Sequence, residues 1–246
     1  MKRLFISDLH LQTERPEITR ALRYFLTHIA PGADELYLLG DVFEAWIGDD
    51  MANPIVKEIA PLFRSLADNG THIFLMHGNR DFLMGSKIAH KLHATLLPEL
   101  WTIEIPKRGK TLLMHGDELC IDDQAYQQFR NQVRDPVWKS DFLDKTLEER
   151  VAIAQHIRSE STKQNSTKTD AIMDVNLEFT EQTVRSHNAR VLIHGHTHRP
   201  TLHTDINGAD DLTRVVLGDW SSSGVYFISE KKLFALSKFE PPSTFI

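Results

Sequence analysis

The stretch 192–200 joins an apolar segment to alternating histidines and ends at a proline. His196 and His198 lie two residues apart in an expected loop, so their imidazoles can face two different points. Gly195 lets the backbone come close to a bound group, because glycine has no side chain. Imidazole is the commonest metal ligand, and alternating histidines would suit two adjacent ions. An isolated His-Thr-His is nevertheless more often a solvated surface loop, so this stretch alone leaves both interpretations open.

Four further clusters of polar side chains follow β-rich, apolar stretches of the chain. They are Asp8-Leu9-His10, Gly40-Asp41, Gly78-Asn79-Arg80-Asp81 and His115-Gly116-Asp117. In open α/β sheets, functional residues collect beyond the carboxyl ends of the strands. One residue alone could simply cap a turn, but five clusters at five strand ends favour one shared site. Its candidate members are Asp8, His10, Asp41, Asn79, His115, His196 and His198.

The types of these side chains indicate a metal centre. Oxygen and imidazole ligands without thiolate suit manganese, iron or zinc and disfavour a structural zinc site. Seven candidates exceed the positions of one octahedral ion, so two ions fit better than one. A carboxylate such as Asp41 can bridge ions about 3.5–4 Å apart, and such pairs activate a water for in-line phosphoryl displacement. The cluster therefore predicts phosphoester chemistry.

The segments between the clusters predict the elements that position them. Pro16 occupies a plausible first helical position and predicts a helix that ends at Pro31-Gly32. Asn53-Pro54 is a cap followed by a first-turn proline, and it predicts a second helix that ends at Asn69-Gly70. Strands are expected over 2–7, 35–39, 71–76, 95–97, 101–105 and 111–114. Strands that alternate with helices indicate an α/β fold.

The alternation stops after residue 123, where only helices are expected until about residue 190. They are expected near 124–134, over 138–158 with a break, and over 169–187. β-rich segments return at 191–194, 202–204, 214–217, 225–228 and 233–238. We therefore expect one domain over residues 1–246 with a helical insertion, a candidate cap, at about 122–170.

Composition limits the classes of protein to which the chain can belong. A hydrophobic fraction of 41% and a charged fraction of 25% are ordinary for a globular protein. No apolar run approaches the roughly 18–20 residues that span a bilayer, and Asp8 and His10 interrupt the N-terminal segment before a signal peptide develops. The single cysteine, Cys120, fits a reducing cytoplasm and a packing role. A net charge of −6 argues against a nucleic-acid partner.

The five clusters together resemble the signature of the calcineurin-type metallophosphoesterases. The resemblance implies a four-layer α-β-β-α sandwich with a dinuclear site. It also implies that one metal takes Asp8, His10 and His198, and that the other takes Asn79, His115 and His196, with Asp41 as the bridge. The neighbouring histidines His77 and His194 are expected to pack or to support the ligands.

Residue 80 departs from the pattern of many members of that family, which carry Gly-Asn-His where this chain has Gly78-Asn79-Arg80. Arginine cannot act as an acid near neutral pH, because its pKa exceeds about 12, but it can stabilise negative charge. A leaving phosphate departs as a stable anion, whereas a leaving alkoxide needs an acid. Arg80 therefore favours pyrophosphate cleavage, and Asp41, Asn79 and Arg80 form the predicted catalytic group.

A closer resemblance is carried by the stretches 39–50, 77–83 and 171–176, which are similar to the UDP-2,3-diacylglucosamine hydrolases of lipid A biosynthesis. The likeness covers nearly the whole chain and weakens around 135–155 and after about 200. It implies hydrolysis of UDP-2,3-diacylglucosamine to UMP and 2,3-diacylglucosamine 1-phosphate, with two Mn²⁺ ions, at the cytoplasmic face of the inner membrane. It also implies substrate contacts by Asn79, Arg80, Asp123, Ser161, Asn165, Lys168 and His196.

The insertion itself allows two interpretations. The polar run 161–168 is a solvated loop in most proteins, but beside a phosphate-cleaving centre it would bind a sugar phosphate. The apolar residues either pack the insertion onto the body or also line a groove for acyl chains. They are Phe129, Val133, Trp138, Phe142, Leu143, Leu147, Val151, Ala154 and Ile157. Acidic and basic residues roughly balance there, so any membrane contact is expected to be peripheral.

Two alternatives stay open at the level of sequence. The chain could be another metallophosphoesterase that acts on a soluble nucleotide pyrophosphate or phosphodiester, and the insertion distinguishes that enzyme from the lipid hydrolase. It could also be a metal-free scaffold with the same fold, although its intact ligand set opposes this. We expect a monomer.

Overall fold

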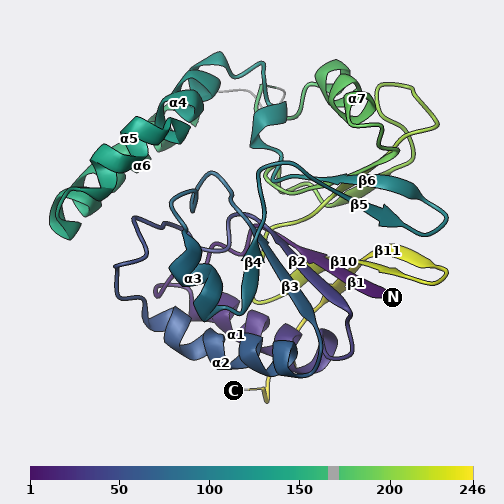
Figure 1. Ribbon diagram of the computed structural model, residues 1–246, viewed down its shortest axis with the longest axis horizontal. Coiled ribbons are helices and arrows are strands. Elements are labelled where there is room, and N and C mark those ends of the chain that lie inside the picture. The colour runs from purple at the N-terminus through teal and green to yellow at the C-terminus, as the bar shows by residue number, and fades with distance from the viewer. Residues whose placement is uncertain (166–171, 246) are drawn as a thin grey trace.

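Two β-sheets form the centre of the protein (Figure 1). The computed structural model describes residues 1–165 and 172–245, and of residues 162, 164 and 165 it describes the backbone alone. The first sheet contains, in order, β11 (Leu233–Phe239), β10 (Gly224–Glu230), β1 (Lys2–Ile6), β2 (Glu35–Leu39), β3 (His72–Met76) and β4 (Ala94–Leu96). The second contains β5 (Trp101–Ile105), β6 (Gly109–Leu113), β7 (Val191–His194), β9 (Thr213–Val216) and β8 (Thr201–His203).

Helices cover the outer face of each sheet, which gives the four layers that the family resemblance implies (Figure 1). Against the first sheet lie α1 (Pro16–Tyr24), a π-helical turn (Phe25–Ile29), α2 (Pro54–Asp68) and α3 (Ser86–Lys91), and against the second lies α7 (Leu177–Ser186). The central strands β1, β2 and β7 are nearly unbroken apolar runs because both of their faces are buried. In β1, Leu4 and Ile6 pack toward the helices and Phe5 packs between the sheets. The α-β-β-α sandwich is thus confirmed.

The register of the strands brings their carboxyl ends level. Phe5, Tyr37 and Phe74 are direct neighbours across β1, β2 and β3, and their rings stack at centroid distances of 4.9 and 4.7 Å. Such cross-strand aromatic pairs stabilise one register over its alternatives. In the second sheet Leu113 pairs with Ile193 in parallel. The loops that follow β1, β2 and β3 therefore start side by side, as do the loops that follow β6 and β7.

The insertion forms three helices that extend from the sandwich at the upper left of Figure 1. They are α4 (Gln124–Arg134), α5 (Pro136–Leu143) and α6 (Leu147–Asn165). The break expected inside 138–158 lies at 144–146, where Thr146 and Glu149 form a reciprocal cap: the Thr146 amide donates to Glu149 Oε2 at 2.9 Å and the Glu149 amide donates to Thr146 Oγ1 at 3.3 Å. None of the helices described here is long and apolar enough to cross a membrane.

Two helical predictions differ from the structure. The helix expected over 169–187 is wrong for residues 172–176, because α7 begins at Leu177, where the Asn176 side chain accepts a hydrogen bond from the Phe179 amide at 2.9 Å. The sequence did not predict α3, which has six residues. Its first turn is capped by the distant Asp49, whose carboxylate accepts from the amides of Gly85, Lys87 and Ile88. Cys120 is buried, as its expected packing role requires.

Candidate metal centre

The predicted ligands lie in strained loops at the strand ends. Five of them have a left-handed backbone conformation, with φ between 51° and 67°: Asp8, His10, Asp41, His196 and His198. Each such residue costs about 1–3 kcal/mol unless its surroundings hold it, and such strain clusters at functional sites. Neighbouring glycines let the loops approach, because a Cβ at Gly78 would collide with Asp41 Oδ1 and one at Gly195 would collide with Asp8 Oδ2.

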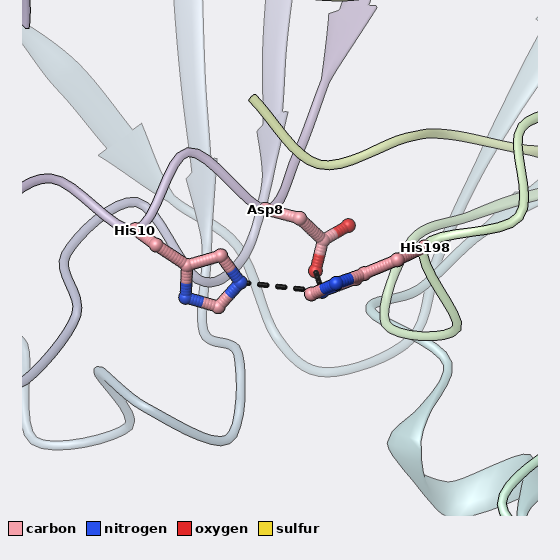
Figure 2. Close-up of side chains that lie close together, drawn as sticks. All are labelled: Asp8, His10 and His198. Carbon is pink, nitrogen blue, oxygen red and sulfur yellow. Dashed lines mark hydrogen bonds and ion pairs between the residues drawn. The ribbon is translucent and has the colours of Figure 1, made fainter. Parts of the chain in front are cut away.

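A first ligand set consists of Asp8, His10 and His198, whose side chains point toward one another (Figure 2). His10 Nε2 lies 3.2 Å from His198 Nε2, and His198 Nε2 lies 3.4 Å from Asp8 Oδ1. The backbone amide of His196 donates to both carboxylate oxygens of Asp8, at 3.1 and 3.0 Å. These contacts join the loop after β1 to the loop after β7.

A second ligand set is centred on Asn79. Its side-chain oxygen lies 2.9 Å from His115 Nε2 and 2.9 Å from His196 Nδ1. His115 is oriented from behind, since its Nδ1 lies 2.8 Å from the carbonyl oxygen of Leu39 and leaves Nε2 directed at Asn79. A backbone partner of this kind fixes the orientation of a ligating imidazole.

Asp41 lies between the two sets. Its Oδ2 is 3.9 Å from His10 Nε2, and its Oδ1 is 3.7 Å from His115 Nε2. The two oxygens of one buried carboxylate thus face the two sets, which is the arrangement that a bridging ligand needs. All seven predicted ligands lie within this series of contacts.

The electrostatics of the centre favour a cation. Burial lowers the pKa of His115, but the adjacent carboxylates of Asp41 and Asp8 outweigh that effect and raise the pKa to about 9. Burial raises the pKa of Asp8, yet hydrogen bonding to His198 and the charge of His115 hold it well below its usual range. Two buried carboxylates surrounded by imidazole nitrogens and an amide oxygen fit a divalent first-row cation.

Three acidic residues that sequence reasoning left without a role support the ligands. Asp81 accepts hydrogen bonds from the amides of Gly78 and Val42 at 2.8 and 2.7 Å, and so ties the loops after β2 and β3 together. Glu44 Oε2 lies 3.0 Å from His10 Nδ1, and the buried Asp117 follows His115 by two residues. Asp81 and Asp117 stand inside the predicted motifs, which was the only sequence signal for them.

Glu44 also lies close to two arginines. Burial raises the pKa of its carboxyl group, but His10, Arg80 and Arg158 together lower it to about 2. Arg158 belongs to α6 and forms an ion pair with Glu44. Glu44 therefore connects the insertion with the first ligand set.

His77 and His194 contact backbone carbonyls. His77 Nε2 lies 2.6 Å from the Met84 carbonyl oxygen, and His194 Nδ1 lies 2.9 Å from that of Gly195. Burial lowers their pKa values to about 4 and about 3. Both imidazoles are therefore neutral and serve the packing of the loops.

The predicted substrate contacts are only partly brought together. Arg80 is half-buried beside the metal site, and its amide donates to Asp41 Oδ1 at 2.8 Å. Asp123 is buried and caps α4, accepting from the Tyr126 amide at 3.1 Å, and Ser161 is half-buried on α6. The contacts predicted for the Asn165 side chain and for Lys168 lie outside the described residues.

Comparison with known proteins identifies the class to which this fold and site belong. Residues 1–200 match the model of the calcineurin-like phosphoesterases, and the chain belongs to this family. The match confirms the predicted family, and a divalent-metal site is what its ligand sets provide.

Two similar relatives carry the same name. The chain is 46% identical over 222 residues to a UDP-2,3-diacylglucosamine hydrolase of Chromohalobacter salexigens, with 89% of each chain aligned. It is 46% identical over 224 residues to the protein of that name from Shigella dysenteriae, with 91% of this chain and 93% of the relative aligned. A solved archaeal phosphodiesterase aligns with 97% of this chain at 16% identity and a TM-score of 0.47.

Proposed function

We propose that the protein hydrolyses the pyrophosphate bond of UDP-2,3-diacylglucosamine and releases UMP and 2,3-diacylglucosamine 1-phosphate, with two Mn²⁺ ions bound. The observation that carries the proposal is the position of Asp41, whose two oxygens face two separate ligand sets. Relatives that align over about nine-tenths of the chain are named for this substrate, which supports its identity. The enzyme is thus a metal-dependent hydrolase.

The chemistry divides between the ions and the side chains. When bound, the pair of ions supplies an activated water and neutralises phosphate charge. Asp8, His10 and His198 would hold one ion, Asn79, His115 and His196 would hold the other, and Asp41 would bridge them. Arg80 stabilises the charge that develops on the phosphate oxygens. No acid is needed at its position, because the leaving group is itself a phosphate.

The insertion would act as a cap over about 122–170 that holds the acyl chains. The structure divides its apolar residues into two groups. Phe142 is 3% exposed and packs with the core of the sandwich, and Trp138 stacks on it at a centroid distance of 5.0 Å. Leu143, Leu147 and Val151 are 40%, 40% and 42% exposed. The exposed group is available to bind acyl chains. We propose that the same group makes peripheral contact with the cytoplasmic face of the inner membrane, and that the protein is a monomer.

We predict that replacing Leu143, Leu147 and Val151 together by serine will raise the KM for the diacyl substrate at least tenfold. A buried methylene contributes about 0.8 kcal/mol and a factor of ten in binding needs only about 1.4 kcal/mol, so losing a few methylene contacts is sufficient. Hydrolysis of a small artificial phosphodiester should be unchanged.

Phe142→Ala is the matched comparison, because this residue is core. It should cost about 3–5 kcal/mol of unfolding free energy and lower the rates on both substrates together. Steady-state kinetics and thermal melting of both variants distinguish the two cases. Equal losses on both substrates in the serine variant, with a lower melting temperature, would contradict an acyl-binding role.

The direct test of the function is incubation of the purified chain and Mn²⁺ with UDP-2,3-diacylglucosamine beside soluble UDP-sugars. We expect UMP and the acylated sugar phosphate from the first substrate and little product from the others. Comparable hydrolysis of soluble UDP-sugars would instead favour the soluble nucleotide pyrophosphatase. In ¹⁸O-labelled water the label should appear in UMP, as attack at the uridine-side phosphorus requires.

A further inference from the structure

Helix α4 of the insertion contacts each loop that carries the second ligand set. Arg134 Nη2 donates to the carbonyl oxygen of Gly78, the residue before Asn79, at 3.0 Å. Arg130 Nε donates to Asp117 Oδ2 at 2.8 Å, and Asp117 follows His115 by two residues. The Tyr126 ring stacks against the His196 ring at 6.0 Å. One helix therefore borders Asn79, His115 and His196 together.

These contacts are buried and cross-linked. The side chains of Arg130 and Arg134 are 11% and 9% exposed, and that of Asp117 is 3% exposed. Tyr126 Oη donates to the same Asp117 oxygen at 2.8 Å. Glu99, whose side chain is 39% exposed, joins the two arginines from the solvent side, since its oxygens lie 2.8 Å from Arg130 Nη2 and 2.7 Å from Arg134 Nη1. Removing one partner from a buried network of this kind is destabilising, because it leaves another charge unpaired.

Arg134 fixes the peptide that precedes a metal ligand. The Gly78 amide donates to Asp81 Oδ1 at 2.8 Å, and its carbonyl accepts from Arg134, so both ends of this residue are held. Gly78 also lies directly against Asp41, where a Cβ would not fit. A shift of the Gly78 carbonyl would therefore move Asn79 and Asp41 relative to each other. Among the described residues, the first ligand set receives no hydrogen bond or ion pair from α4.

We propose that α4 positions the second metal, with Arg134 as the principal positioning residue and Arg130 as its partner. The insertion thus has a second role beside that of a cap, since the ion held by Asn79, His115 and His196 depends on it. This inference rests on the dinuclear centre of the proposed function. Groups that orient metal ligands typically affect metal affinity by about 10–100-fold.

The test is a Mn²⁺ titration of metal-free wild type and Arg134→Met, with free Mn²⁺ and the exchange-coupled pair followed by electron paramagnetic resonance. Wild type should bind two ions per chain. Arg134→Met should bind the first with wild-type affinity and the second at least about tenfold more weakly, so that the coupled-pair signal disappears at concentrations that saturate the wild type.

Arg150→Met is the matched control. Arg150 is also an arginine of the insertion with a largely buried side chain, 4% exposed, and it donates to a backbone carbonyl, that of Ile47, at 2.8 Å, but it contacts no predicted ligand. The Arg150→Met variant should bind both ions with wild-type affinity. Arg134→Lys is a second variant for the case that Arg134→Met fails to fold. It keeps the charge but cannot reach Glu99 and Gly78 together with the same geometry, so it should also weaken binding of the second ion.

Wild-type affinity for both ions in Arg134→Lys and Arg134→Met would overturn the inference, as would an equal loss in Arg150→Met. A wild type that binds a single ion would instead contradict the dinuclear centre of the proposed function itself. The two failures are therefore distinguishable in one experiment.

Discussion

Asp41→Asn is expected to lower kcat by at least about 10²–10³-fold, the loss that typically follows removal of one preorganised electrostatic group. Asp41 Oδ2 faces His10 and Asp41 Oδ1 faces His115, at 3.9 and 3.7 Å. An amide keeps the shape of the side chain and its acceptor for the Arg80 amide, but it loses the negative charge that would hold the two cations of the proposed centre together. The variant should therefore fold normally but bind the metal pair poorly.

Mn²⁺-dependent turnover and thermal melting of the variant measure these two properties separately. His115→Ala should show the same loss of turnover, since it removes a ligand that no water can replace with the same geometry. Asp68→Asn is a suitable control, because the Asp68 side chain is 67% exposed on α2. Near-normal Mn²⁺-dependent rates in both Asp41→Asn and His115→Ala would contradict the assignment of the ligands.

Candidate ligands could be predicted from the sequence because each lies directly after a recognisable local pattern. Every one follows an apolar run that is buried on both faces, as Asp41 follows Leu38 and Leu39. Parallel strands in register then bring these loops to one edge of each sheet. The resemblance to a known family rested on the same local motifs, and the family model confirms it.

The residues that support the ligands had no such signal. Glu44 and Arg158 are 114 positions apart, and Arg134 and Gly78 are 56 apart, so their contacts exist only after the insertion has folded onto the sandwich. The same reason explains why α3 escaped prediction, since its cap comes from Asp49. Tertiary contacts decide these features, and no local pattern carries them.

The apolar residues of the insertion illustrate the same limit. Phe142 and Leu143 are adjacent in sequence and similar in hydrophobicity, yet one is 3% exposed and the other 40%. Neighbours on a helix point to different faces, but the pattern does not tell which face meets the body. Sequence could therefore pose the question of an acyl groove, and the structure selects the residues that test it.

Arg80→Lys is expected to lower kcat by about 10²-fold although the formal charge survives. The planar guanidinium donates two parallel hydrogen bonds to phosphate oxygens, whereas an ammonium acts as a point charge. Arg80 is half-buried, and its side chain has no hydrogen-bond or ion-pair partner among the described residues. Its guanidinium is thus available to the substrate.

The substitution tests the Arg80 side chain without changing the contacts of the metal ligands. Arg80 contacts a predicted ligand only through its backbone, by the amide that donates to Asp41 Oδ1 at 2.8 Å, and lysine retains that amide. Mn²⁺ stoichiometry should therefore stay at the wild-type value while kcat falls, and Arg23→Lys, at a partly exposed position of α1 that pairs with Glu58, should change neither. Wild-type turnover at saturating substrate in Arg80→Lys would show that charge alone suffices at this position, and the role assigned to the planar guanidinium would then fail.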